Sequence, residues 1–278
     1  MLKRTLCLLV LVVVSAAACN AQGTEDAPTI QDNSFLVEEA YNQEFGVVQH
    51  IQTFQRLWQS KDWAYTFTQE WPYDPAPRHQ LSYTMPVLFF GSNAQNGIGD
   101  IALNYRYQLV GDGKAKIAVA PRATLLLPTG DSRRELGAGG PGVQLMLPAS
   151  VVFTKHWVTH WNIGTTIVPR AKSPAGAYSA TYGYNLGQSI VWLARPRFNL
   201  LLETVFNSSE SVIASRRTQR SNDVFLNPGA RWAYNFKNGL QIVPGVSVPI
   251  GFAGSSGERG LFLYLSFEHP YRKIPKKD

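Results

Sequence analysis

The fold is decided by the stretch Asp100-Ile101-Ala102-Leu103-Asn104-Tyr105-Arg106-Tyr107-Gln108-Leu109. From Ile101 onward every second side chain is apolar, and the side chains between them are polar or small. Successive side chains of a β-strand point to opposite faces of the sheet, so this period of two gives one apolar and one polar face. A strand of this kind lies at the boundary between two different environments.

The same alternation continues from Val47 to Phe267, and no segment of helical period and comparable length interrupts it. Most of the segments have the ~9 to 11 residues with which a tilted strand crosses a bilayer. The first is the weakest prediction, because neither of its faces is cleanly apolar. The predicted strands cover about residues 47–58, 62–71, 80–90, 98–110, 114–128, 142–154, 157–169, 178–194, 197–206, 223–236, 239–252 and 260–268.

The connections between these strands alternate in length through most of the chain. Short turns are predicted at residues 111–113, 155–156, 195–196 and 237–238, and longer connections at residues 93–97, 129–141, 170–177, 207–222 and 253–259. An even number of strands, with short turns on one side and long loops on the other, is typical of outer-membrane barrels. The sequence therefore predicts an all-β fold, a closed antiparallel up-and-down transmembrane β-barrel of about 12 strands. A soluble secreted sandwich is the alternative, but it gives no reason for the alternating loops.

The composition agrees with a membrane barrel. Of the 278 residues 45% are hydrophobic and only 16% are charged, against roughly 25% in soluble domains. A lipid-facing half of each strand accounts for the missing charge. The formal charge of +7 includes Lys3 and Arg4 near the N-terminus, and the other basic residues form no single face with a reading element. We therefore expect no nucleic-acid partner.

The N-terminus predicts export. Lys3 and Arg4 precede the apolar run 6–14, which is too short to span a bilayer and is followed by small residues, as in a secretory signal peptide. Cleavage can occur between Ala21 and Gln22; alternatively, residues 16–19 weakly resemble a lipobox with Cys19 as lipid acceptor. The predicted organisation is a signal peptide (1–21), a polar N-terminal lead-in (22–45), an outer-membrane β-barrel (46–268) and a basic C-terminal tail (269–278). The lead-in is expected to be flexible or to fold back as a short plug or helix.

Three stretches resemble a known family. They are residues 33–43 (NSFLVEEAYNQ), 97–107 (GIGDIALNYRY) and 120–130 (APRATLLLPTG). Together they resemble a bacterial outer-membrane β-barrel family of transporters linked to the meta-cleavage pathway of phenol degradation, and the likeness covers most of the mature chain. The resemblance implies a barrel in the outer membrane of a Gram-negative cell, with a transport role for aromatic or other apolar compounds. It supplies no binding residues.

Charged residues at the inward positions of the strands are the candidate lumen-lining residues: Glu70, Arg106, Arg122, Glu203 and Arg231. A charge inside a small barrel needs a partner or water, because a lone buried ion is costly. An approximate register places Glu203 opposite Arg231 and predicts an ion pair between them. The arginines either hold the strands together across the lumen or form a rung that attracts anionic solutes.

Other motifs give no catalytic, metal or cofactor site, and none is predicted. Residues 137–142 are rich in glycine but lack the Gly-Lys-Ser/Thr ending of a phosphate loop, and His156 and His160 lie ~13 Å apart on an extended strand, too far for one zinc ion. A Ser150–His156 pair would be the basis of a lipid hydrolase, but both positions are inward and no Gly-x-Ser-x-Gly occurs.

The sequence thus predicts a transporter or diffusion channel for small solutes, aromatic or apolar ones among them. A structural outer-membrane protein is the alternative, and an outer-membrane lipid hydrolase is the third interpretation. The expected partners are outer-membrane lipid and a small-molecule solute, with the oligomeric state left open. Lipopolysaccharide is a further candidate, since it could meet loop arginines at positions 133, 134, 216, 217 and 220.

Overall fold

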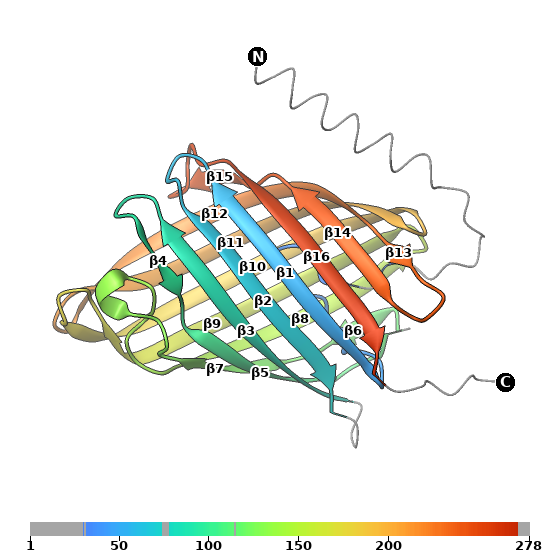
Figure 1. The fold of residues 1–278 in the computed structure, drawn as a ribbon, viewed down its shortest axis with the longest axis horizontal. Helices are drawn as coiled ribbons and strands as arrows, with labels where there is room; N and C mark the ends of the chain where they lie inside the picture. The colour runs from blue at the N-terminus through green and yellow to red at the C-terminus, as the bar shows by residue number, and fades with distance from the viewer. Residues whose placement is uncertain (1–29, 31, 74–77, 114, 272–278) are drawn as a thin grey trace, which may run out of the picture.

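The computed structural model describes residues 30, 32–73, 78–113 and 115–271, and within them the chain is almost entirely β-structure (Figure 1). The predicted signal peptide lies outside the described residues. A short 3-10 helix, η1 (Ser132–Arg134), sits in one connection, and no helix in the described ranges is long and apolar enough to cross a membrane. The strands are β1 (Val47–Leu57), β2 (Trp63–Pro72), β3 (His79–Phe90), β4 (Gln95–Ile98), β5 (Ile101–Tyr107), β6 (Ile117–Val119), β7 (Arg122–Leu127), β8 (Gly142–Thr154), β9 (Trp157–Lys172), β10 (Tyr178–Arg195), β11 (Phe198–Ala214), β12 (Arg217–Trp232), β13 (Tyr234–Asn235), β14 (Gln241–Ser247), β15 (Ile250–Ala253) and β16 (Gly260–Pro270).

These segments form one closed antiparallel barrel, as predicted. β1 pairs with β2 on one side and with β16 on the other, from Val47 opposite Pro270 to Leu57 opposite Gly260. Four barrel strands are each interrupted once, so that β4 continues into β5, β6 into β7, β12 into β13 and β14 into β15. The described segments therefore make a barrel of twelve strands, and the predicted weak strand at 47–58 is confirmed as β1.

The barrel has two distinct ends. β1 begins and β16 finishes at one of them, which we call the terminal end; the other, the loop end, carries the connection that contains η1 (Figure 1). Outer-membrane barrels have short periplasmic turns and longer extracellular loops. By this rule we expect the loop end to face the cell exterior.

The prediction of a long loop at residues 207–222 was wrong. β11 and β12 continue through it as a hairpin and are paired up to Ala214 opposite Arg217. Strand residues that extend beyond the lipid need no apolar face, so the alternation disappears there although the backbone pairing does not. Of the arginines in this hairpin, Arg220 forms an ion pair with Glu210 (2.8 Å) and lies 5.3 Å from the centre of the Tyr184 ring.

The two faces of the barrel wall differ as the alternation predicts. The outer face exposes apolar side chains that a soluble protein would bury, such as Leu145 (52% exposed) and Ile163 (59%). Trp157 and Trp192 stack on each other near the terminal end, with ring centres 6.0 Å apart. The inner face is polar: Gln80, Asn162 and Glu203 are buried on it. This is the distribution of a barrel whose outer wall contacts lipid.

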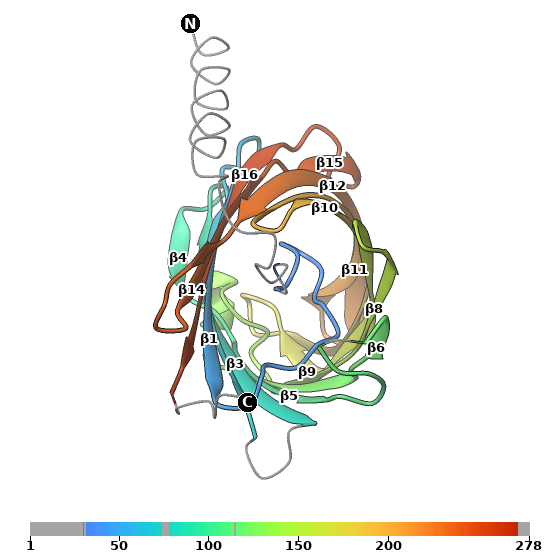
Figure 2. The same cartoon turned by 90° about the vertical axis from the view of Figure 1, so that its right-hand side faces the viewer.

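Residues 32–46 lie inside the barrel and form what we call the plug. Figure 2, which looks into the terminal end, shows this segment crossing the interior before it continues into β1. Ser34 and Ala40 have no exposed surface, and Val37 has 1%. Of the two expectations for the described part of the lead-in, the structure shows the folded-back plug.

Candidate functional site

The plug is held by a carboxylate on the inner wall. Glu203 of β11 has no exposed surface, and its Oε1 accepts hydrogen bonds from the backbone N–H groups of Phe35 (3.0 Å), Leu36 (2.9 Å) and Val37 (3.0 Å). Its Oε2 accepts from Nδ2 of Asn227 (2.7 Å). Three consecutive N–H groups that converge on one oxygen form an anion-binding nest of the backbone. Here the anion belongs to the wall and the nest to the plug.

Arg106 of β5 holds the other part of the plug. Its guanidinium donates to the carbonyl oxygens of Glu39 (3.2 Å) and Tyr41 (2.9 Å) and to Oδ1 of Asn42 (3.1 Å). Glu70 lies 3.5 Å from the same guanidinium, so the arginine charge is balanced within the wall. Arg106 is 3% exposed and is therefore occupied by the plug rather than open to solutes.

Arg122 of β7 lies directly opposite Arg106 in the β5–β7 register. A tight turn centred on Asp112 predicts that Arg106 faces about residue 118, with Arg122 about four residues further from the turn; this prediction was wrong, because the chain between β5 and β6 is longer than the predicted turn. Arg122 forms an ion pair with Glu38 of the plug and donates to Oε1 of Gln144 (2.7 Å). Each of the two facing arginines thus has a carboxylate partner of its own.

Arg231 of β12 donates to the carbonyl oxygens of Asp32 and Asn33, both at 2.6 Å. The carboxylate of Asp32 accepts from Gln49 (2.8 Å), Tyr264 (2.5 Å) and Ser266 (2.5 Å). The first described turn of the plug is therefore fixed to three strands of the wall.

The predicted ion pair between Glu203 and Arg231 was wrong. Glu203 faces Asn227 across the β11–β12 ladder, and Arg231 faces Asn199. The ladder is centred on Ser215, close to the middle of the predicted loop, and this register leaves Arg231 four residues beyond the partner of Glu203; the approximate register was therefore too loose to place the pair. Both charges instead bind the plug, one through its N–H groups and the other through its carbonyl groups.

Further contacts follow the plug along its length. Oγ of Ser34 lies 2.7 Å from Oγ of Ser189, and the N–H of Ala40 donates to Oγ of Ser150 (2.8 Å). Asn162 binds both backbone groups of Glu38, donating to the carbonyl (2.9 Å) and accepting from the N–H (2.8 Å). Two more wall side chains accept from the plug backbone: Gln108 from the N–H of Asn42 (2.9 Å) and Gln80 from the N–H of Gln43 (2.7 Å).

The ring of Phe35 occupies a notch in the wall made by Gly229 and Gly245. A Cβ atom on either glycine would lie 2.5 Å or 2.4 Å from the ring, closer than any real contact. No pattern in the sequence indicates this contact, because the notch exists only once β12 and β14 pair. The position of Gln80 and Gln108 in the alternation indicates that their side chains point inward. Nothing in the sequence identifies the plug backbone as their partner.

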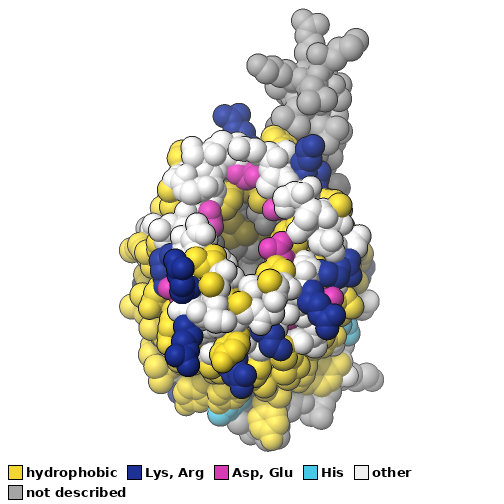
Figure 3. Space-filling model, turned by 90° about the vertical axis from the view of Figure 1, so that its left-hand side faces the viewer, with side chains coloured by type: hydrophobic (Ala, Val, Ile, Leu, Met, Phe, Trp, Pro, Cys, Tyr) yellow, Lys and Arg dark blue, Asp and Glu magenta, His cyan; other side chains and the backbone are white. Residues whose placement is uncertain are grey.

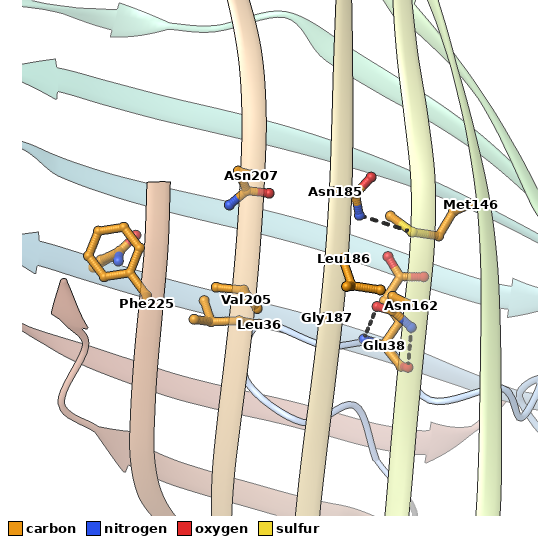
Figure 4. Close-up of a pocket in the computed structure, with 11 residues that line it drawn as sticks. Leu36, Glu38, Met146, Asn162, Asn185, Leu186, Gly187, Val205, Asn207 and Phe225 are labelled. Atoms are coloured by element: carbon orange, nitrogen blue, oxygen red, sulfur yellow. Dashed lines mark hydrogen bonds between the residues drawn. The ribbon is translucent and has the colours of Figure 1, made fainter. Parts of the chain in front are cut away.

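A cavity of about 220 Å³ lies above the plug on the side of the loop end. Figure 3, which looks into the loop end, shows the hollow that leads into the barrel. Leu36 and Glu38 of the plug contribute to its lining, together with side chains of β8 to β12 (Figure 4). The plug therefore occupies the lower part of the lumen and leaves a small chamber toward the loop end.

The Ser150–His156 pair is not brought together. Oγ of Ser150 lies 2.8 Å from Nδ1 of His160 instead, and both side chains are buried beneath the plug, whereas His156 is exposed in the β8–β9 turn. Within the described part of the chain no three His, Cys, Asp or Glu side chains form a group that could hold a metal ion.

The architecture agrees with known proteins. The family described as "Putative MetA-pathway of phenol degradation" matches residues 26–267. The chain is similar to an outer membrane channel from Pseudomonas putida F1, with 14% identity, a TM-score of 0.61, and coverage of 83% of this chain and 97% of that chain. It is also similar to the NanC porin, with 9% identity, a TM-score of 0.50, and coverage of 79% and 98%. At these identities the likeness shows the fold. No curated protein matches the sequence.

Proposed function

Because the chain belongs to this family and folds as an outer-membrane barrel, we propose that it is a narrow channel for small solutes, constricted by its own N-terminal segment. The proposal includes export by the signal peptide predicted at residues 1–21. The observation that carries it is the plug: wall side chains on many strands bind its backbone, and a hollow on the loop side leads down to it. Solutes that reach the periplasm must pass this constriction.

The geometry favours a channel over the two alternatives. A purely structural barrel has no need of a chamber that opens at the loop end. A hydrolase on the outer wall needs an accessible nucleophile, but Ser150 has no exposed surface and holds the plug backbone. Lipid is the expected partner of the outer face, and small solutes, apolar or aromatic ones included, are the expected partners of the lumen.

Liposome swelling tests the proposal. Vesicles containing the full-length protein are diluted into glycerol, arabinose or sucrose, and their swelling is compared with that of protein-free vesicles. We expect glycerol to enter well ahead of sucrose, and a variant with a weakened plug, Glu203→Ala, to admit the larger solutes faster. If neither protein swells vesicles above the protein-free rate with any solute, the barrel is not a channel.

A further inference from the structure

The cavity above the plug has two chemically different halves. Leu36, Val205 and Phe225 present apolar side chains on one side, from the plug, β11 and β12 (Figure 4). Asn185 and Asn207 lie on the other side, on β10 and β11. An occupant that satisfies both halves must itself have an apolar part and a polar part.

The polar half offers uncharged hydrogen-bonding groups. The carboxylate of Glu38 is neutralised by its ion pair with Arg122, and the amide of Asn162 is taken up by the plug backbone. By contrast, the side chains of Asn207 and Gln55 make no hydrogen bond to any residue that the structure describes, and Asn185 donates only to the weak acceptor Sδ of Met146 (3.3 Å). Three amides are thus available to a molecule in the cavity.

Apart from the Arg122–Glu38 ion pair, the wall at this level carries hydroxyl and amide side chains. Oγ1 of Thr53 lies 2.5 Å from Oγ1 of Thr66, and Oγ1 of Thr68 lies 2.8 Å from Oγ1 of Thr84. Gln144 continues the series by donating to Thr166 (3.0 Å). Channels that select ions place charged side chains or carbonyl rings along the path. A lining of hydroxyl and amide groups does not select solutes by net charge.

We propose that this cavity is a binding site for a small uncharged amphipathic solute, with its apolar part against Leu36, Val205 and Phe225 and its hydrogen-bonding head at Asn185 and Asn207. This inference deepens the proposed channel function and rests on it, since the site is where a solute would pause above the plug. The volume of about 220 Å³ is below the roughly 300–1,000 Å³ of pockets that hold drug-sized ligands, so the solute is smaller than such a ligand.

The two halves also determine what is rejected. An anion or a cation would leave its hydration shell for neutral amides and an apolar wall, which is costly without an opposite charge. A polyol without an apolar face would leave hydroxyl groups unpaired against Phe225 and Val205. The expected order of affinity is therefore cyclohexanol first, with cyclohexanecarboxylate and glycerol both much weaker.

Methionine methyl NMR on the full-length protein in lipid nanodiscs tests this order. The sequence contains three methionines, and Met146 lines the cavity, whereas Met85 shares the outward parity of the exposed Leu81 on β3. Cyclohexanol should shift the Met146 methyl signal in a saturable manner. The Met85 signal reports any non-specific partition of the probe into the lipid. Equal shifts of Met146 with cyclohexanol and cyclohexanecarboxylate, or no saturable shift with cyclohexanol, would overturn the proposal.

A matched pair of variants ties the effect to the cavity. Asn207→Leu removes one amide from the polar half at a position that is exposed within the barrel, and it should weaken cyclohexanol binding about tenfold, the loss expected for one hydrogen bond. Asn222→Leu makes the same change at an exposed residue of β12 that does not line the cavity, and should leave binding unchanged. Unchanged binding in Asn207→Leu would refute the assigned polar half. The outcome is separable from the channel test: saturable binding without vesicle swelling refutes the channel alone, and swelling without binding refutes the site alone.

Discussion

The nest around Glu203 predicts how firmly the plug is seated. Replacing Glu203 by Ala removes the acceptor of the N–H groups of Phe35, Leu36 and Val37 at once. Hydrogen bonds to a charged group contribute about 1.5–3 kcal/mol each, but the three share one acceptor oxygen and are not additive, so the total loss is smaller than their sum. We take about 4 kcal/mol. Each 1.4 kcal/mol is a factor of ten, so the fraction of molecules with the plug unseated should rise roughly a thousandfold.

Cysteine labelling measures this fraction directly. Ala40 has no exposed surface when the plug is seated, and the predicted cleavage before Gln22 would leave no other cysteine in the mature chain. In an Ala40→Cys background, the rate of reaction with a membrane-impermeant maleimide is proportional to the unseated fraction. Glu203→Ala should raise that rate by about three orders of magnitude.

The control for this experiment is Glu210→Ala. Glu210 lies on the same strand as Glu203 but pairs with Arg220 near the loop end and does not contact the plug. Its removal should leave the labelling rate of Ala40→Cys unchanged. If Glu203→Ala also left the rate unchanged, the nest would not hold the plug, and the reasoning from its three hydrogen bonds would be refuted.

Three further predictions follow from other contacts of the structure. Ser34→Cys/Ser189→Cys should form a disulfide on mild oxidation, because the two Oγ atoms are already 2.7 Å apart. The oxidised protein should keep the wild-type solute cut-off in liposome swelling even when it also carries Glu203→Ala. If Glu203→Ala admitted larger solutes through the oxidised protein as it does without the disulfide, the prediction would be contradicted. Gly245→Val should displace Phe35, since a Cβ there would lie 2.4 Å from the ring, and should accelerate labelling of Ala40→Cys, whereas Gly183→Val on β10, whose Cβ would have no neighbour closer than 3.5 Å, should not. In the β15–β16 loop, burial raises the pKa of Glu258, but hydrogen bonds from the N–H groups of Gln59 (2.8 Å) and Ser60 (2.9 Å) outweigh it and leave the pKa below its usual value. A carboxyl whose pKa is lower in the folded state contributes stability above its unfolded pKa, and this stability is lost as the pH falls through the folded pKa. Amide hydrogen exchange at Gln59 and Ser60, corrected for its intrinsic rate, should therefore accelerate on acidification in the wild type but not in Glu258→Gln.

The strands were predictable because their period of two is imposed by lipid. Each residue such as Leu103 or Ile163 must face the bilayer, and its neighbours must then face inward, so the alternation can be read without knowledge of any partner. Where lipid ends, the signal ends too. The paired strands at 207–222 are largely exposed and show no alternation of apolar and polar residues, so the sequence does not distinguish them from a loop.

The inward charges were predictable, but their partners were not. The parity of Arg106 and Glu203 placed them inside, yet their partners are backbone N–H and carbonyl groups of the plug, which every residue type carries. Sequence therefore contains no signature of that match. A search among side chains alone led to the Glu203–Arg231 pair, which does not form.

The plug also explains why the barrel tolerates so many buried charges. A wall of twelve strands is too wide for its own side chains to fill, and Glu203, Arg106 and Arg231 have 0 to 3% of their surface exposed, where an unpaired charge would be costly. The plug backbone pairs with these charges through its N–H and carbonyl groups. The charged part of the wall is thus adapted to a peptide and not to a solute. On the proposed function, discrimination among solutes belongs instead to the level above it, where Asn207 and Gln55 line the cavity.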